Sequence, residues 1–594
     1  MATPKLFRLK AEVAPAPSGP IASVLPYARV RVDTGVFHLE QLYDYQIPEK
    51  LTALIQVGVR VQLPFGNRET EGIVVERVAQ PERAGELKSI TKVLSATPVA
   101  TVQSLHVIDL ISQHYACNPW DLIRSAIPPR VASVDKSIQG VIVDSSKSSK
   151  RTIEFQTLAP FIQAHNQVVR LVQENQGAGS ILIVAPDEKD VDLIIGALTK
   201  FGLSSVKLTA AMPREERYRN YLEAMRRSIS IVVGTRSAIF APVNNLTTVI
   251  IHKESSLDHY EVRSPGWNTR TVALIRSEVE SFKLVLTGFS PSIEVAQLID
   301  EREIKYLNAK ESVTVKAFTP SEGALLPGRI FTDVKKALTS GPVLFIAPRK
   351  GYGNALLCAH CRNVAACECG GRLSVSAKGK APACVHCGNS FPAWKCTFCN
   401  RDKQYLAGRG IERAAEEISR AFPNFPVVIS AGEVIKDRIE AKPALVLATP
   451  GAQPQVEGGY AAVVILEGLR FFAHTDLRTQ ERARELFLET SSLISPEGSV
   501  LLVIDDSHPI VSAIARWNIA PLLKRELSER AELKLPPSVF SVVLVMDQAI
   551  SMQIANGLKK AAAEGRIPPS SCIYGPTEIS KGQVKIVIHA DKKD

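Results

Sequence analysis

Eight of the ten cysteines of this chain lie between Cys358 and Cys399, and this cluster restricts the local fold more than any other feature of the sequence. Two cysteines about two residues apart can direct both thiolates at one ion across a tight turn. Four thiolates in a tetrahedron close a structural zinc site that has no open position. The cysteines form four such pairs: Cys358 and Cys361, Cys367 and Cys369, Cys384 and Cys387, and Cys396 and Cys399. The spacing therefore predicts two structural zinc ions.

Two alternatives to zinc remain open for this segment. Reduced cysteines without a metal would have almost no hydrophobic residues between them to hold a fold, whereas zinc–thiolate bonds contribute on the order of 10 kcal/mol per site. Iron–sulfur clusters usually show a different cysteine spacing. His360 and His386 lie inside C-x-x-C loops, and we interpret them as solvated loop residues rather than ligands.

The length and charge of the chain limit its architecture and its partners. One hydrophobic core cannot organise 594 residues, so three or more domains are expected. Apolar residues make up 45% and charged residues 22%, which is a globular composition. Lysine and arginine total 71 against 60 acidic residues, and the resulting net charge of +11 permits nucleic acid as a partner without requiring it.

The sequence does not indicate a membrane protein. Its start carries basic residues without a continuous apolar stretch, which argues against a secretory signal. The most apolar stretches, such as residues 461–466 and 499–504, are far shorter than the roughly 20 residues needed to cross a bilayer. We therefore expect a cytoplasmic protein without a membrane partner, and in that reducing compartment clustered cysteines favour metal over disulfides.

The first part of the chain predicts a small β-rich domain. Residues 1–27 are rich in proline and alanine and are expected to form a disordered tail. Alternating stretches such as ARVRV and TEGIVVERV predict strands, and residues 99–125 have helical periodicity, so a domain is expected over residues 28–132. Residues 133–152 are rich in serine and lysine and predict a linker.

The remainder predicts two tandem α/β domains and a small α+β domain. Short buried-strand stretches such as SILIVAP, TTVIIH and FKLVLTG alternate with helical stretches, which is typical of a parallel sheet. A second series includes GPVLFIAP, PALVLAT and GSVLLVID. The expected domains are residues 153–310, residues 311–515 with the cysteine-rich insert at 355–402, and residues 516–594. The fold class is thus α/β multidomain.

Several segments resemble the PriA family of bacterial replication restart proteins (primosomal protein N′). ALLCAHCRNVAACECGG and FPAWKCTFCN resemble the two ends of that family's zinc module, and GTRSAIFAP matches a segment of its first lobe. SERAELKLPP resembles the start of its C-terminal domain. LYDYQIPEKL, GVRVQLPFGNRETEGIVVERV and ELKSITKVL resemble its domain that binds a DNA 3′ end. The resemblance covers nearly the whole chain from about residue 28.

The resemblance implies a superfamily 2 helicase scaffold of two RecA-like lobes, with an interleaved zinc module in the second. In that arrangement Cys358 and Cys361 share the first ion with Cys396 and Cys399. The second ion is held by Cys367, Cys369, Cys384 and Cys387. The Cys367-x-Cys369 pair is one residue shorter than the C-x-x-C that is usual in the family, which weakens the expectation for the second site.

The motor motifs of the family are missing from the first lobe. A P-loop requires GxxxxGK[ST], so that backbone N–H groups wrap the phosphates while Lys and Ser/Thr handle phosphate and magnesium. The chain contains no such motif, and FQTLAPFIQAHNQVVRLV stands in its place. The Asp-Glu-x-His box is replaced by His252-Lys253-Glu254-Ser255. A lysine cation next to a magnesium site is repulsive.

The second lobe departs from the family in the same way. ATPGAQPQVEGG stands where a Thr-Gln-containing motif belongs, and FLETSSLISPEG replaces the segment that supplies the arginine finger. Phosphoryl transfer depends on charge neutralisation by Lys, magnesium and Arg together. Loss of all three predicts a protein without catalytic residues that does not hydrolyse ATP. The family's winged-helix domain is missing too, because residues 133–152 are too few to contain one.

A pocket for a DNA 3′ end is implied by the same resemblance. The family's aromatic–Asp pair, Gly turn and Lys correspond to Tyr43 and Asp44, Gly66 and Lys88. A ring can stack on the terminal base, Asp can accept hydrogen bonds from the base or free hydroxyl, and Lys can meet phosphate. For each residue alone, surface turn chemistry is the favoured explanation, and the pocket is favoured only for the four together with the matching strands around them. Tyr260 and Trp267 resemble an aromatic-rich loop, for which packing is an equal alternative.

These observations favour one function over two others. The favoured one is a replication restart protein that binds stalled or branched forks and helps to assemble the primosome without helicase activity. Its expected cofactors are two zinc ions, and its expected partners are branched or single-stranded DNA and primosome and replicative helicase-loading proteins, with single-stranded DNA-binding protein as a further candidate. The alternatives are an ATP-dependent 3′–5′ helicase with a highly diverged nucleotide site, and a zinc-ribbon protein that acts on RNA or protein.

Overall fold

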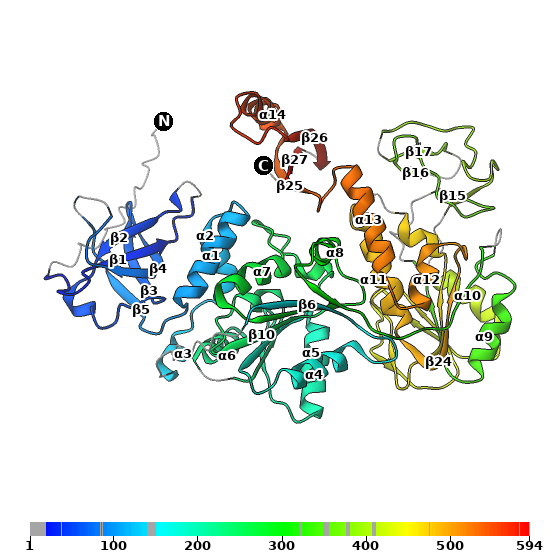
Figure 1. Ribbon diagram of the computed structural model, residues 1–594, viewed down its shortest axis with the longest axis horizontal. Coiled ribbons are helices and arrows are strands. Elements are labelled where there is room, and N and C mark those ends of the chain that lie inside the picture. Colours follow the sequence, from blue (N-terminus) through cyan, green and yellow to red (C-terminus); the bar gives the residue numbers. More distant parts are fainter. Residues whose placement is uncertain are drawn as a thin grey trace, which may run out of the picture. The chain divides into compact units, whose positions relative to one another are not determined.

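The computed structural model divides the chain into two compact units. Unit 1 comprises residues 1–154 and 165–287, and unit 2 comprises residues 155–164 and 288–594 (Figure 1). The structure describes all residues except 1–18, 37–38, 83–84, 86, 139–149, 227–228, 321–323, 349–355, 376–379, 386, 407–410, 474–475, 581 and 593–594. Most of the expected tail and linker, and His386, therefore lie outside the described residues.

Unit 1 begins with a five-stranded antiparallel sheet. Its strands are β1 (Tyr27–Val32), β2 (Leu42–Gln46), β3 (Arg60–Phe65), β4 (Arg68–Val78) and β5 (Lys92–Ser95). They lie in the order β2-β1-β4-β3-β5. Along β1, buried and half-buried residues alternate, because successive side chains point to opposite faces of the sheet. The expected β-rich domain is therefore built on one buried face that includes Val30, Val61 and Val74.

The prediction that residues 1–27 form a disordered tail is wrong for the last part of that range. Ala22 is 2% exposed and packs in the core of the N-terminal sheet. Its N–H donates to the carbonyl of Ile47 at 2.8 Å, and the N–H of Glu49 donates to the carbonyl of Pro20. The Pro/Ala-rich composition did not reveal these contacts, because they join the segment to residues far along the chain.

Three helices follow the sheet, and the last one shortens the expected linker. They are α1 (Val102–His114), α2 (Pro119–Ala126) and α3 (Ala132–Ser137). Thr101 and Ser104 form a reciprocal capping box at the start of α1. Helix α3 lies where the linker was expected to begin. Val134 is fully buried there, and Asp135 accepts a hydrogen bond from the Tyr218 hydroxyl at 2.8 Å, so these residues belong to the folded unit.

The second part of unit 1 is a parallel α/β structure. Its strands are β7 (Ser180–Val184), β8 (Val206–Leu208), β9 (Ile231–Gly234), β10 (Leu246–Ile251) and β11 (Lys283–Gly288), in the order β11-β10-β7-β9-β8. Its helices are α4 (Ala164–Glu174), α5 (Glu188–Lys200), α6 (Arg214–Arg226) and α7 (Thr269–Glu280). Every residue of β7 is buried, as expected where helices cover both faces of a sheet.

Unit 2 contains a second parallel sheet with helices on both faces. Its strands are β13 (Val315–Ala317), β14 (Val343–Ile346), β19 (Val427–Ser430), β21 (Leu445–Ala448), β23 (Tyr460–Ile465) and β24 (Ile494–Leu502), in the order β13-β24-β23-β14-β21-β19. The helices are α9 (Ile330–Leu338), α10 (Ile411–Ala421), α11 (Thr479–Ser491), α12 (Pro509–Ala515) and α13 (Ala520–Glu532). Successive residues of the central strands enter two separate cores, as Leu344 and Phe345 illustrate.

A border between the two units falls inside strand β6 (Thr152–Thr157), between Glu154 and Phe155. Strand β12 (Lys305–Leu307) is the neighbour of β6 in a seven-stranded sheet, and α8 (Ile293–Asp300) precedes β12 in sequence. The side chain of Tyr306 accepts a hydrogen bond from Thr157 at 3.2 Å. The border between the two units therefore lies earlier in the chain than the expected division at residue 310.

The chain ends in a small α+β structure. Strands β25 (Val539–Asp547), β26 (Cys572–Ser580) and β27 (Gln583–Asp591) form an antiparallel sheet with β27 in the middle, and α14 (Gln548–Ala563) packs on it. Trp517 and Leu523 instead belong to the core of the preceding α/β structure, so the expected start of this domain at residue 516 is too early. No helix in the described part of the chain is long and apolar enough to cross a membrane.

Candidate zinc centres and DNA-binding site

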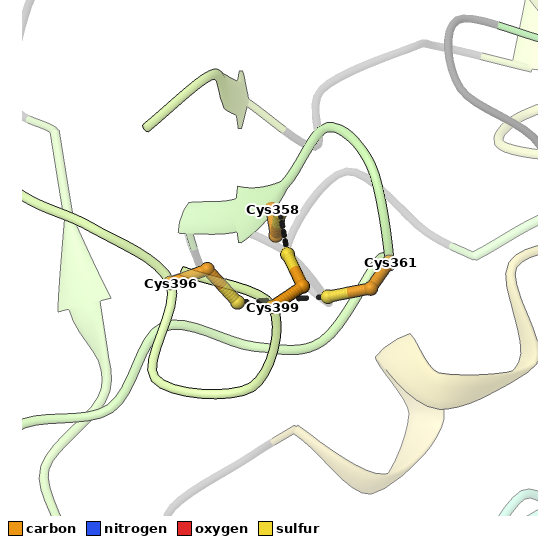
Figure 2. Close-up of side chains that lie close together, drawn as sticks. All are labelled: Cys358, Cys361, Cys396 and Cys399. Carbon is orange, nitrogen blue, oxygen red and sulfur yellow. Dashed lines mark hydrogen bonds between the residues drawn. The ribbon is translucent and has the colours of Figure 1, made fainter. Parts of the chain in front are cut away.

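The first cysteine cluster joins the two ends of the cysteine-rich insert. Cys358 ends strand β15 (Leu356–Cys358), which pairs with β18 (Gln404–Leu406), and two turns carry the other cysteines. The sulfurs of Cys358 and Cys399 are 3.4 Å apart, and those of Cys361 and Cys396 are 3.5 Å apart. Figure 2 shows the four side chains pointing at a common centre. All four sulfurs lie within 4.8 Å of one another.

The second cluster lies between these ends. Its sulfurs are 3.7 Å apart for Cys367 and Cys387 and 3.5 Å apart for Cys369 and Cys384. Gly370 follows the short pair with a φ of +79°, a left-handed conformation that residues with a side chain rarely adopt. The tight turn lets Cys369 reach the same centre as Cys367 despite the shorter spacing. Cys369 and Cys387 are exposed, so this cluster is more open than the first.

Both clusters fit a tetrahedral zinc ion. Zinc–sulfur bonds of 2.3 Å place the sulfurs of a tetrahedral site about 3.8 Å apart, close to the sulfur–sulfur distances in each cluster. Neither spacing nor composition decided which cysteines meet. The structure brings together the same two sets of four that the family resemblance implies.

The described residues of the cysteine-rich insert form only a small apolar core. Its buried cluster contains four apolar residues besides the cysteines, namely Leu356, Ala365, Leu373 and Trp394. The Nδ1 atom of His360 lies 3.1 Å from Arg401, so this ring faces a guanidinium and belongs to neither group of four. Tyr405 donates its hydroxyl proton to Glu467 at 2.8 Å, which ties the insert to the end of β23.

The four residues of the expected DNA pocket lie on neighbouring parts of the N-terminal sheet. Tyr43 and Asp44 are on β2, Gly66 forms the turn between β3 and β4 with a φ of +61°, and Lys88 precedes β5. The Lys88 ammonium donates to the carbonyl of Gly66 at 3.0 Å. This hydrogen bond therefore holds the Lys88 cation at the Gly66 turn. The ammonium carries three donor hydrogens, so it can meet a phosphate as well.

Asp44 and Tyr43 are held by different contacts. The carboxylate of Asp44 accepts from the N–H of Glu82 at 2.7 Å and lies 3.6 Å from Arg29, the residue opposite it on β1. Tyr43 donates its hydroxyl proton to the carbonyl of Leu39, and its ring packs edge-on against Phe65 at 5.0 Å. Arg29 was not among the residues expected from the sequence. Arg29 lies in the alternating ARVRV stretch, which predicts a strand. That position was the only signal in the sequence that Arg29 could face a side chain of a neighbouring strand.

The segment that stands where the family has its Asp-Glu box is closed by its own ion pairs. Directly after β10, the Lys253 ammonium lies 3.3 Å from Asp190, and the Arg270 guanidinium lies 3.1 Å from Glu254. The Glu254 side chain is fully buried. Lys253 and Arg270 thus each pair with an acidic side chain at this position.

Two fully buried histidines accompany these ion pairs. His252 Nδ1 lies 3.1 Å from the hydroxyl of Thr287, and His259 Nε2 lies 2.8 Å from the carbonyl of His252. Burial lowers the pKa of His252 to about 3 and that of His259 to about 4, with Lys253 and Arg270 acting in the same direction. Asp190 opposes these shifts. Both rings are neutral at pH 7.

These histidines predict that unit 1 loses stability in mild acid. An unfolded histidine takes up a proton near pH 6.5, so the stabilisation is complete above that pH and disappears as the pH falls toward 4. Between pH 7 and pH 5 the free energy of unfolding should fall by about 2 kcal/mol for each ring. Urea titrations at both pH values measure this loss. His259→Gln should remove about half of it, and the exposed His106→Gln should remove none.

The segment at the P-loop position is packed into the core of unit 2. Leu158, which follows β6, is 2% exposed, and its N–H donates to the carbonyl of Gly288 at 2.9 Å. Its carbonyl accepts a hydrogen bond from the indole nitrogen of Trp517 at 2.8 Å. The N–H of Phe161 donates to the carbonyl of Ser492. These two N–H groups therefore bond to the protein itself.

The two aromatic residues of the expected loop have different surroundings. Trp267 is 1% exposed and meets Phe240 edge-on at 4.9 Å inside unit 1. This contact favours the packing interpretation for Trp267. Tyr260 is half-buried and forms a β-bridge with Asn268, at the base of a turn on which Val262 is 90% exposed.

Comparisons of the sequence with known proteins and protein families agree with one another in the family that they indicate. Residues 29–128 match the family model of the PriA 3′DNA-binding domain (3′BD). The chain is 22% identical to the replication restart protein PriA of Rickettsia felis over 604 residues, which covers 93% of each chain. Among solved structures, the E. coli DExH-box NTPase HrpB matches with a TM-score of 0.34 at 11% identity, covering 60% of this chain and 39% of that one, a likeness too weak to carry an argument.

A mycobacterial relative is more similar. The probable replication restart protein PriA of Mycobacterium tuberculosis is 31% identical over 558 residues, and the match covers 86% of this chain and 85% of that protein. This chain belongs to the PriA family of replication restart proteins.

Proposed function

We propose that this protein binds branched or single-stranded DNA at stalled forks and supports replication restart without hydrolysing ATP. The observation that carries the proposal is the segment at the P-loop position. A P-loop offers its backbone N–H groups to phosphates. Here the N–H groups of Leu158 and Phe161 are bonded within unit 2, and no lysine of the P-loop type follows them.

The position of the Asp-Glu box supports the same proposal. A magnesium-binding acid must leave room and negative charge for a divalent cation. In this protein Asp190 already faces the Lys253 ammonium, and Glu254 faces Arg270. Binding of magnesium would have to break these pairs inside a buried region. These contacts support the proposal that phosphate and magnesium are not bound here as they are in an active helicase.

An ATPase assay on the full chain tests the absence of hydrolysis. We expect phosphate release at the background rate of a reaction without protein, with and without single-stranded or forked DNA. Turnover that rises with DNA would overturn the proposal in favour of a helicase with a diverged nucleotide site. Fork binding measured on the same preparation provides the control that the protein is active.

DNA recognition is proposed to start at the N-terminal pocket. Asp44 offers a carboxylate held in place by Arg29 and a backbone N–H, and Lys88 offers a cation at the Gly66 turn. A carboxylate can accept a hydrogen bond from the free 3′ hydroxyl, whereas lysine neutralises phosphate. A fork with a free 3′ end is therefore the expected ligand.

Variants of this pocket should separate the two roles. Lys88→Ala should weaken binding to all forks and reduce the slope of log affinity against log salt by about 1. Asp44→Ala should abolish the preference for a free 3′ hydroxyl over a blocked one. Fluorescence anisotropy measures both effects. Lys50→Ala, an exposed lysine of the same domain, should change neither, and equal affinity of the unaltered protein for free and blocked ends would contradict the pocket.

The cysteine-rich insert is proposed to bind two zinc ions and to serve as a platform for primosome and helicase-loading proteins. The four-sulfur clusters support zinc, because a closed set of thiolates gives structure and leaves no position for catalysis. Metal analysis of the purified chain should therefore find about two zinc ions per molecule.

A further inference from the structure

Arg29 connects three neighbouring strands of the N-terminal sheet. It lies on β1, which has β2 on one side and β4 on the other (Figure 1). In the register of these strands it is opposite Asp44 on β2 and opposite Glu76 on β4. Because directly opposite residues of neighbouring strands share one face of a sheet, the three side chains form a row of negative, positive and negative charge.

The guanidinium of Arg29 contacts both carboxylates of this row. Its Nη1 donates to Oε2 of Glu76 at 3.1 Å, and its Nε lies 3.6 Å from Oδ1 of Asp44. Among the described residues, Nε has no acceptor within hydrogen-bond distance, so Arg29 acts on Asp44 as an ion pair rather than through a hydrogen bond. Glu76 thus fixes one part of the guanidinium while another part faces Asp44.

The two carboxylates of the row differ in exposure. The side chain of Asp44 is 7% exposed, against 54% for Glu76. A nearly buried carboxylate is costly unless a hydrogen-bond donor and an opposite charge compensate it. For Asp44 the donor is the N–H of Glu82, which bonds to Oδ2 at 2.7 Å, and the opposite charge is that of Arg29. Water compensates Glu76 in addition, so Asp44 depends more on the arginine.

These contacts leave the second oxygen of Asp44 able to accept a hydrogen bond. Oδ2 is turned toward the backbone at Glu82, whereas Oδ1 lies on the side of Arg29 at ion-pair distance. A carboxylate oxygen has two acceptor positions, so Oδ1 can accept from a hydroxyl group while Arg29 stays beside it. Arg29 and the N–H of Glu82 together select the orientation of the carboxylate that offers Oδ1.

We propose that Arg29 is a positioning residue for the 3′ end of DNA: held by Glu76, it keeps the Asp44 carboxylate turned so that Oδ1 accepts a hydrogen bond from a free 3′ hydroxyl. The inference rests on the proposed function, because it assigns the recognition of the 3′ end to one further residue and one oxygen atom. It restricts the ligand to ends that carry a hydroxyl group, since an ionised carboxylate has no proton to donate.

Fluorescence anisotropy of the full chain with two forks tests the proposal. One fork ends in a 3′ hydroxyl and the other in a 3′-deoxy sugar, so the two differ in this group alone. The unaltered chain should bind the hydroxyl fork about tenfold more tightly, the effect of one hydrogen bond to a charged group. Arg29→Gln should bring this ratio close to one and leave the affinity for the deoxy fork unchanged. Arg29→Lys keeps the charge and should restore part of the ratio.

Two further variants show whether the effect belongs to the charge row. Glu76→Gln releases one part of the guanidinium and should lower the ratio about threefold, less than Arg29→Gln, because Glu76 is exposed and its pair is screened. Arg124→Gln removes an arginine of the same domain that pairs with Asp33 at 2.8 Å, and it should keep the full ratio. Thermal unfolding shows that each variant is folded before its binding is compared.

The possible outcomes separate this inference from the proposed function. Equal affinity of the unaltered chain for both forks would overturn the pocket and the role of Arg29 with it. A full ratio in folded Arg29→Gln would overturn the role of Arg29 alone, as would an equal loss of affinity for both forks, which indicates a purely structural residue. A full ratio in Glu76→Gln would overturn the part assigned to Glu76.

Discussion

Replacing Cys361 by serine is expected to remove one zinc ion and unfold the first cysteine cluster. Serine is a poor zinc ligand, and each structural zinc site contributes on the order of 10 kcal/mol to the fold that it closes. The described residues of the insert form only a small apolar core, which is too small to replace that contribution. Metal analysis should show a fall from about two zinc ions to about one, and limited proteolysis should cut the insert.

Two comparisons make this result specific. Cys572→Ser removes an exposed cysteine of β26 that belongs to neither cluster, and it should keep both ions. Chelator titration should empty the second cluster first, because Cys369 and Cys387 are exposed whereas Cys358 and Cys396 are buried. Retention of both ions in Cys361→Ser would contradict the assignment of that residue as a ligand.

Replacing Trp517 by alanine is expected to lower the free energy of unfolding of unit 2 by about 3–5 kcal/mol, the range for removing a buried aromatic ring. The indole is 1% exposed and packs edge-on against Phe289 at 6.3 Å. It also holds the segment at the P-loop position through its bond to the carbonyl of Leu158. Urea unfolding followed by circular dichroism measures the loss.

Trp517→Phe separates the ring from its N–H. Most of the buried ring remains in this variant, but the carbonyl of Leu158 loses its donor, so the expected loss is about 1–3 kcal/mol. A loss below 1 kcal/mol in Trp517→Ala would show that the segment is held by other contacts. Neither variant should gain ATPase activity, because the sequence lacks a P-loop lysine wherever the segment lies.

Much of the fold could be predicted from the sequence because it depends on local patterns. The buried runs of β7 and β10 and the alternation along β1 identified the two kinds of sheet. The boundaries of the folded domains were less predictable. Ala22 and Val134 are buried by residues distant in sequence, so neither the composition of the tail nor that of the linker revealed that they are folded.

The residues of the candidate sites were also only partly predictable from the sequence. The motifs brought Tyr43, Asp44, Gly66 and Lys88 together as one expected pocket, and the structure places Lys88 on the Gly66 turn. Arg29 was missed because its importance comes from the strand opposite it.

The sequence alone predicted that eight cysteines in four close pairs form metal-binding groups, and it contains no GxxxxGK[ST] sequence, because both conclusions rest on residue types at short spacing. Only the tertiary structure brought the two sets of four sulfurs together, paired Lys253 with Asp190, and placed the carbonyl of Leu158 where it accepts a hydrogen bond from the Trp517 indole. Each of these contacts joins segments that are distant along the chain. The packing of the helices and sheets fixes such contacts, and no local pattern encodes it.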